Sequence, residues 1–154
     1  MVLLSVGTQK QQFTRLFELV LNCEELKKEK IISQSGYTKF EDNRIESFDF
    51  ISLEKMDEYM EKADLVICHG GVGTILSAIM KGKKVIAIPR LAKYGEHINN
   101  HQIEICEELE KEGYILYYKD GVDTLDELIK KIKTINFKEY KSDRNYLDIL
   151  RKEI

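Results

Sequence analysis

Six short apolar runs alternate with amphipathic helical patterns along the chain, and this alternation constrains the possible folds more than any other feature. The runs lie at residues 1–6, 30–34, 45–50, 65–68, 84–88 and 114–118. Residues 65–68 are apolar throughout, which is typical of a strand buried on both faces. Strands that alternate with helices form a parallel sheet joined by right-handed crossovers. We therefore predict an α/β fold, a doubly wound, Rossmann-like sheet with strand order 3-2-1-4-5-6 and helices on both faces.

Local signals place several helix ends. Ser52 precedes one apolar-periodic segment, and Thr124 with Glu127 has the spacing of a capping box. Gly82 and Gly113 follow two other helical patterns as predicted stops.

A change of pattern near residue 137 suggests two parts, a domain over 1–137 and a tail with a helix over 138–154. The tail carries an apolar stripe of Tyr146, Leu147, Leu150 and Ile154. We expect this stripe to dock on a partner protein. The alternative is that it completes the core of this domain.

Composition excludes several classes of protein. The formal net charge of −3 over 154 residues argues against general affinity for nucleic acid. Three cysteines without a C-x-x-C pair predict neither a disulfide framework nor a zinc site, and favour a reducing, cytoplasmic setting. No apolar run approaches the ~20 residues of a membrane span, so a function at a membrane would require a partner that holds the chain there.

The strand at 65–68 is followed by three glycines, Gly70, Gly71 and Gly73, and then by a helical pattern that starts near Thr74. A glycine-rich turn allows backbone N–H groups to approach an anion, and a helix N-terminus carries partial positive charge. This pattern predicts phosphate binding. The alternative is that the glycines only form a tight turn between strand and helix.

Position in the predicted sheet supports a site. The first and fourth strands are neighbours at the switch point of such a sheet, where ligands bind beyond the carboxyl ends. The loops that follow these strands contain Gly7, Thr8 and Gln9, and residues 69–74. The loop after the fifth strand would border the same place. Neither G-x-G-x-x-G after the first strand nor a P-loop is present.

The spacing of two histidines allows a metal site, but only as a minority interpretation. His97 and His101 are four residues apart, but residues 89–95 have a loop pattern, so the pair need not share one helical face. We expect no metal. His69, at a strand end, is either a packed, hydrogen-bonded residue or a participant in chemistry.

Three motifs together resemble a known family. A-D-L-V-I-C-H-G-G-V-G-T at 63–74, G-K-K-V-I-A-I-P-R at 82–90 and G-E-H-I-N-N-H-Q at 95–102 are similar to the C-terminal half of GT-B glycosyltransferases of family 28. V-G-T-Q at 6–9, followed by F-x-R-L, also matches. The likeness extends to the small subunits of split enzymes, namely the PssE type of bacterial capsule and exopolysaccharide synthesis and the cytosolic subunit of the dolichol-linked UDP-GlcNAc transferase.

The resemblance implies a hexosyltransferase that uses a UDP-sugar without metal or other cofactor and inverts the anomeric carbon. It implies a polyprenyl-diphosphate-linked acceptor, and a membrane-associated partner that supplies the N-terminal half and recruits this cytoplasmic chain to the inner face of the membrane. The residues expected at the donor are Gly7, Thr8, Gln9, His69, Gly70, Gly71, Val72, Gly73, Thr74, Ser77, Asn100 and Gln102. Ser77 stands where many relatives have a glutamate for the ribose.

A general base must deprotonate the acceptor hydroxyl, and Glu96 and His97 are the catalytic candidates in this chain. The alternative is that the base belongs to the partner and these two residues only shape the donor pocket. Another class of function is a non-catalytic nucleotide-binding module that stabilises or regulates a membrane partner. A sugar-nucleotide epimerase of similar fold would normally carry both halves in one chain.

Overall fold

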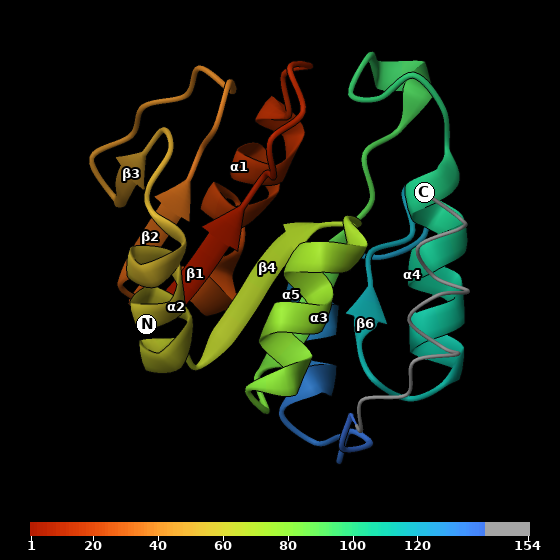
Figure 1. Ribbon diagram of the computed structural model, residues 1–154. Helices are drawn as coiled ribbons and strands as arrows, with labels where there is room; N and C mark the ends of the chain where they lie inside the picture. Colours follow the sequence, from red (N-terminus) through yellow and green to blue (C-terminus); the bar gives the residue numbers. More distant parts are fainter. Residues whose placement is uncertain (141–154) are drawn as a thin grey trace.

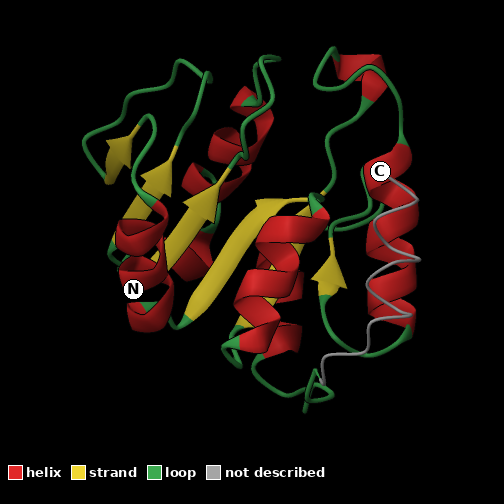
Figure 2. Cartoon of the chain, viewed as in Figure 1, coloured by secondary structure: helices red, strands yellow, loops and turns green. Residues whose placement is uncertain are grey.

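The computed structural model describes residues 1–140 as one parallel sheet with helices on both faces (Figures 1 and 2). The sheet order is β3-β2-β1-β4-β5-β6, and every pairing between neighbours is parallel. The strands are β1 (Val2–Ser5), β2 (Ile31–Gln34), β3 (Ile45–Phe48), β4 (Leu65–His69), β5 (Lys84–Ile88) and β6 (Leu116–Tyr117). The helices are α1 (Thr14–Leu21), α2 (Leu53–Lys62), α3 (Val72–Met80), α4 (His101–Lys111) and α5 (Leu125–Ile132), with short 3₁₀ turns η1 (Glu24–Leu26) and η2 (Ala92–Tyr94). The predicted fold class and strand order are confirmed.

Alternate residues of the strands build two separate layers of core. Leu4 and Ile67 face the layer that contains α1 and α5, whereas Leu3 and Val66 face the layer that contains α2, α3 and α4. Figure 1 shows the second layer in front of the sheet and the first layer behind it. Burial on both faces explains why the central strands are continuously apolar in sequence.

The predicted helix ends are confirmed where the structure describes them. Ser52 Oγ accepts the N–H of Lys55 at 3.1 Å, and Thr124 Oγ1 accepts the N–H of Glu127 at 3.2 Å. Gly82 and Gly113 follow α3 and α4 with φ of 72° and 86°, in the left-handed region that glycine adopts without strain.

Two local predictions need correction. β6 is confined to Leu116–Tyr117 because the N–H of Tyr114 donates to the Leu109 carbonyl at 3.0 Å, which holds the start of the apolar run against the end of α4. The stretch predicted as a loop after β5 contains η2, which ends at Gly95 with φ of 69°.

The domain continues past the boundary expected after residue 137. The N–H of Lys138 donates to the Gly113 carbonyl at 3.0 Å. Tyr140 is buried, and its ring packs edge-to-face on Tyr114 with 5.4 Å between centroids. The apolar stripe of the tail lies outside the described residues. Within residues 1–140, no helix is both long enough and apolar enough to cross a bilayer.

Candidate functional site

Three loops meet at the carboxyl edge of the sheet, the upper edge in Figure 1. They follow β1, β4 and β5, which are adjacent in the sheet order. Because all strands are parallel, these loops leave the sheet on the same side. The structure therefore brings together the segments that the sequence predicted to form a site.

His69 is the last residue of β4, and its imidazole lies between two of the glycines. A Cβ on Gly7 would be 2.5 Å from His69 Nε2, and a Cβ on Gly71 would be 2.1 Å from His69 Cε1. Gly7 also has φ of 77°. Packing of this ring therefore accounts for the absence of a side chain at both glycines.

Gly70 has a similar internal explanation. A Cβ there would lie 2.7 Å from Gln102 Cβ and 2.9 Å from Cys106 Sγ, so α4 packs directly on the backbone of the turn. The N–H of Gly70 donates to Gln102 Oε1 at 2.9 Å. Gln102, expected to contact a donor sugar, is only 5% exposed, and its side chain binds the backbone of the turn.

Gly73 differs from these glycines. It is exposed in the first turn of α3, and no neighbouring atom described by the structure lies within 4 Å of the Cβ position. The N-cap residue is Gly71, so no N-cap side chain accepts a hydrogen bond from the first N–H groups of the helix. The first N–H groups of a helix have no intrahelical acceptor, so this end of α3 can receive an anion. Internal packing does not explain the absence of a side chain at Gly73.

The imidazole of His69 is buried and makes two side-chain contacts. Its Nε2 is 3.4 Å from Thr74 Oγ1, and its Nδ1 is 3.3 Å from Gln102 Nε2. Burial, followed by the charges of Arg90 and His97, lowers the pKa of His69 to about 3. The ring is therefore neutral at neutral pH.

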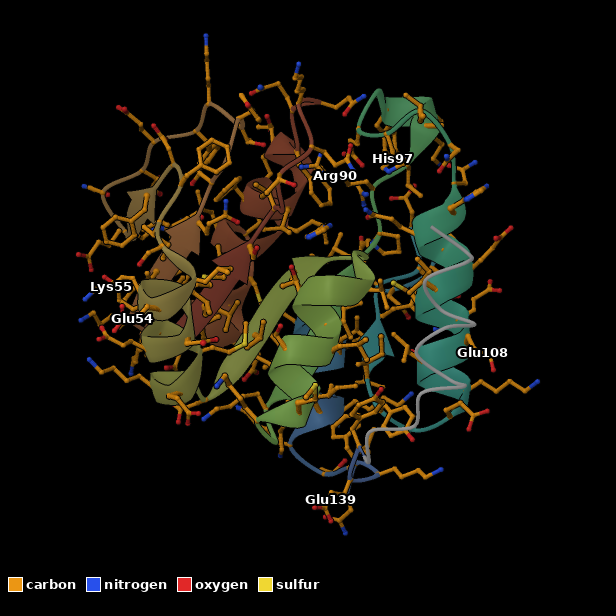
Figure 3. The ribbon with its side chains drawn as sticks, in the orientation of Figure 1. Glu54, Lys55, Arg90, His97, Glu108 and Glu139 are labelled. Carbon is orange, nitrogen blue, oxygen red and sulfur yellow. The ribbon has the colours of Figure 1, made fainter. Side chains whose placement is uncertain are left out.

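Arg90 is a central residue of the site to which the sequence analysis gave no role. Its side chain is fully buried and lies at the upper edge of the molecule (Figure 3). Its guanidinium donates to the carbonyls of Val6, Gln11 and Glu96 at 2.6–3.2 Å, from both loops that flank the glycine turn. An arginine two residues past a buried strand, after Pro89, was the signal available in the sequence.

Glu96, one of the two catalytic candidates, is engaged in an ion pair. Its carboxylate accepts from Arg15 Nε and Nη2 at 3.0 and 2.9 Å, and from the N–H of Leu91 at 3.0 Å. Glu96 is 3% exposed. Because its carboxylate is paired with the partly buried Arg15 and also accepts a backbone amide through Oε1, Glu96 holds the loop after β5.

His97 lies on the same loop and is half-buried (Figure 3). Its Nδ1 accepts the N–H of Asn99 at 3.3 Å. Burial, followed by the charges of Arg90 and His101, lowers the pKa of His97, which favours the neutral form that a base requires.

The remaining expected residues are distributed around this centre. Thr8 and Gln9 are exposed in the loop after β1. Ser77 is exposed one turn along α3, and its hydroxyl donates to the Gly73 carbonyl at 2.9 Å. Asn100 Oδ1 accepts the N–H of Ala92 at 3.0 Å. Asn100 also lines a cavity of about 330 Å³ at the ends of β5 and β6.

A metal centre finds no support among residues 1–140, where no three His, Cys, Asp or Glu side chains form a group that could hold an ion. α4 begins at His101, whereas His97 belongs to the preceding loop. The two histidines therefore do not share a helical face.

Comparison with known proteins identifies relatives of this arrangement. The profile of the glycosyltransferase family 28 C-terminal domain matches residues 1–147. The UDP-N-acetylglucosamine transferase subunit ALG13 of Yarrowia lipolytica is 30% identical over 126 residues, which cover 70% of this chain and 60% of that one. The human protein of the same name is 38% identical over 64 residues, 42% of this chain and 5% of that one.

Solved structures show the same fold at low sequence identity. A solution structure of ALG13 superimposes with a TM-score of 0.64 at 19% identity, over 95% of this chain and 91% of that one. MurG of Acinetobacter baumannii gives a TM-score of 0.57 at 18% identity, over 99% of this chain and 49% of that one. This chain thus spans between 5% and 60% of the length of the two ALG13 sequences described above.

Proposed function

Because the chain belongs to the glycosyltransferase family 28 C-terminal domain family, we propose that it is the donor-binding subunit of an inverting glycosyltransferase. In this proposal it binds a UDP-sugar, and the assembled enzyme moves the sugar to a polyprenyl-diphosphate-linked acceptor in capsule or exopolysaccharide synthesis. The relatives named as UDP-N-acetylglucosamine transferase subunits support a UDP-sugar donor.

The observation that carries the proposal is the open amino end of α3 at Gly73, across from the loop of Gly7, Thr8 and Gln9. The first-turn N–H groups, among them those of Val72 and Thr74, would bind the donor diphosphate. As the sugar leaves, negative charge develops on the diphosphate. Donors fixed in advance stabilise that charge with little reorganisation, and no metal is needed in this arrangement.

The general base is proposed to be His97 or a group of the partner, because Glu96 is held by Arg15. If the base belongs to the partner, this chain is a nucleotide-binding module, and the partner deprotonates the acceptor. The burial of Glu96 favours this second assignment. The partner would be membrane-associated, supply the other half of the cleft, and hold this cytoplasmic chain at the inner face of the membrane. Residues 143–154 are proposed to dock on it.

The test is an NMR titration of the ¹⁵N-labelled chain with UDP in the presence of EDTA. We expect the amide signals of Gly7 and of residues 70–74 to shift, with no gain in affinity when magnesium replaces EDTA. Uridine, which lacks the diphosphate, is the matched control and should bind at least tenfold more weakly. Binding only with magnesium, or equal binding of uridine, would contradict the proposed site.

A further inference from the structure

Gln102 is oriented by two backbone amides. Its Oε1 accepts the N–H of Gly70 at 2.9 Å and the N–H of Arg90 at 3.0 Å. A rotated amide would place its NH₂ group against both of these donors. The orientation of the side chain is therefore fixed by the turn after β4 and the end of β5 together.

This orientation determines which nitrogen of His69 carries the proton. Gln102 Nε2 faces His69 Nδ1 at 3.3 Å, and an amide NH₂ group can only donate. Nδ1 must then be the acceptor, which leaves the ring proton on Nε2. A protonated, cationic ring would place two donors against each other, so the same contact disfavours the imidazolium.

Nε2 is the ring nitrogen of His69 that lies nearest to both loops proposed to hold the diphosphate. Thr74 Oγ1 lies 3.4 Å from Nε2 on the α3 side. On the other side, Nε2 is the nearest atom to the position of a Gly7 Cβ. An anion held by these loops would favour the tautomer with an N–H at this nitrogen, whereas the other tautomer would present a lone pair to it.

We propose that Gln102 is a positioning residue that locks His69 as the neutral Nε2–H tautomer, so that this imidazole donates a hydrogen bond to the donor diphosphate. The inference rests on the proposed function for its ligand, but the tautomer itself is a property of the free protein. It replaces the expectation that Gln102 contacts the donor sugar. The lowered pKa of His69 is consistent with a ring kept neutral.

The first measurement is the ring nitrogen spectrum of His69 in the free wild-type chain, by ¹⁵N–¹H correlation NMR at pH 7. We expect a neutral ring with the proton on Nε2. A ring with the proton on Nδ1, or a ring that is cationic at pH 7, would overturn the proposal without any use of UDP.

The second measurement uses Gln102→Glu, in which a carboxylate oxygen replaces the donor beside Nδ1. At pH 8.5, where the ring is neutral, we expect the proton to move to Nδ1 and UDP affinity to fall at least tenfold. Below the raised pKa of His69 the cationic ring regains Nε2–H, so the affinity relative to wild type should recover toward pH 6. Arg90 and His97, which also face the ring, oppose this protonation and set the pH at which it occurs.

Asn99→Asp is the matched control for the tautomer, because it introduces a carboxylate just before α4, where Asn99 Oδ1 accepts the N–H of His101. It should leave the His69 spectrum unchanged. A Gln102→Glu protein that keeps Nε2–H at pH 8.5, or that loses affinity equally at both pH values, would overturn the proposal. If wild-type His69 shows the Nε2–H tautomer but UDP does not bind, the proposed function fails and the tautomer assignment stands.

Discussion

Gly73→Asp separates stability from ligand binding at the amino end of α3. The Cβ position is open, and the residue is exposed, so the new side chain meets no steric obstacle. Replacing a helical glycine by aspartate gains about 0.3 kcal/mol of helix propensity, and a carboxylate in the first turn adds about 0.3–1 kcal/mol of favourable interaction with the helix dipole. We therefore expect the melting temperature to stay the same or to rise by about 1–4 °C.

Affinity for UDP should change in the opposite direction. A carboxylate about 4 Å from one phosphate charge costs about 1 kcal/mol in bulk water and about 4 kcal/mol at an effective dielectric constant of 20. Since about 1.4 kcal/mol is a factor of ten in affinity, the expected loss is from about fivefold to about 1,000-fold. Added salt should reduce this loss, because mobile ions screen exposed charges.

The assay combines thermal unfolding followed by circular dichroism with calorimetric titration of UDP. Leu53→Asp is the matched control, because Leu53 is 88% exposed at the first position of α2, another helix that begins at this edge. The control places the same charge in the first turn of another helix and should keep wild-type affinity. Wild-type affinity in Gly73→Asp, or a fall of several degrees in its melting temperature, would refute the reasoning.

Three further predictions concern the surroundings of this turn. Gly71→Ala should destabilise the domain by about 1–3 kcal/mol in urea unfolding, because its Cβ would overlap the ring of His69; unchanged stability would show that the ring is not confined there. Between pH 7 and 5 the free energy of unfolding should fall by about 2 kcal/mol. In the unfolded chain His69 takes up a proton near pH 6.5, whereas in the folded chain its pKa is about 3 and it stays neutral. The lowered pKa of His97 acts in the same direction. A His69→Gln variant should show a flatter dependence of the free energy of unfolding on pH. Glu96→Gln should lower stability by about 1–3 kcal/mol in urea unfolding, because Arg15 loses its ion pair with Glu96 but keeps Asp120 at 3.7 Å. His97→Ala should lower the transfer rate by about 10²–10⁴-fold in the assembled enzyme with donor affinity unchanged, and a normal rate would assign the base to the partner.

The fold was largely predictable because its signals are local and repeated. Each buried strand is an apolar run, and the capping residues Ser52 and Thr124 act within one helical turn. The edge strand β6 was predicted too long, because a bond from Tyr114 to the end of α4 competes with the ladder. Such a contact depends on how two elements meet in space, which the sequence pattern does not contain.

The location of the candidate site was predicted better than the roles within it. The strand order alone places the loops after β1, β4 and β5 together. The ion pair of Glu96 with Arg15 was not predicted, because Arg15 is distant in sequence and becomes adjacent only when α1 packs on the sheet. Arg90 was missed for the same reason, since its acceptors Val6 and Gln11 belong to another loop.

Natural selection would act in two different ways on the glycines around this turn. Gly7, Gly70 and Gly71 are required by neighbouring atoms, so a descendant that kept the fold and lost its ligand would still retain them. Gly73 has no such requirement and, without a ligand, would be free to drift toward residues that favour a helix. Among sequences that share this pattern, the third glycine of the turn is therefore the position at which loss of the proposed donor binding would be recorded.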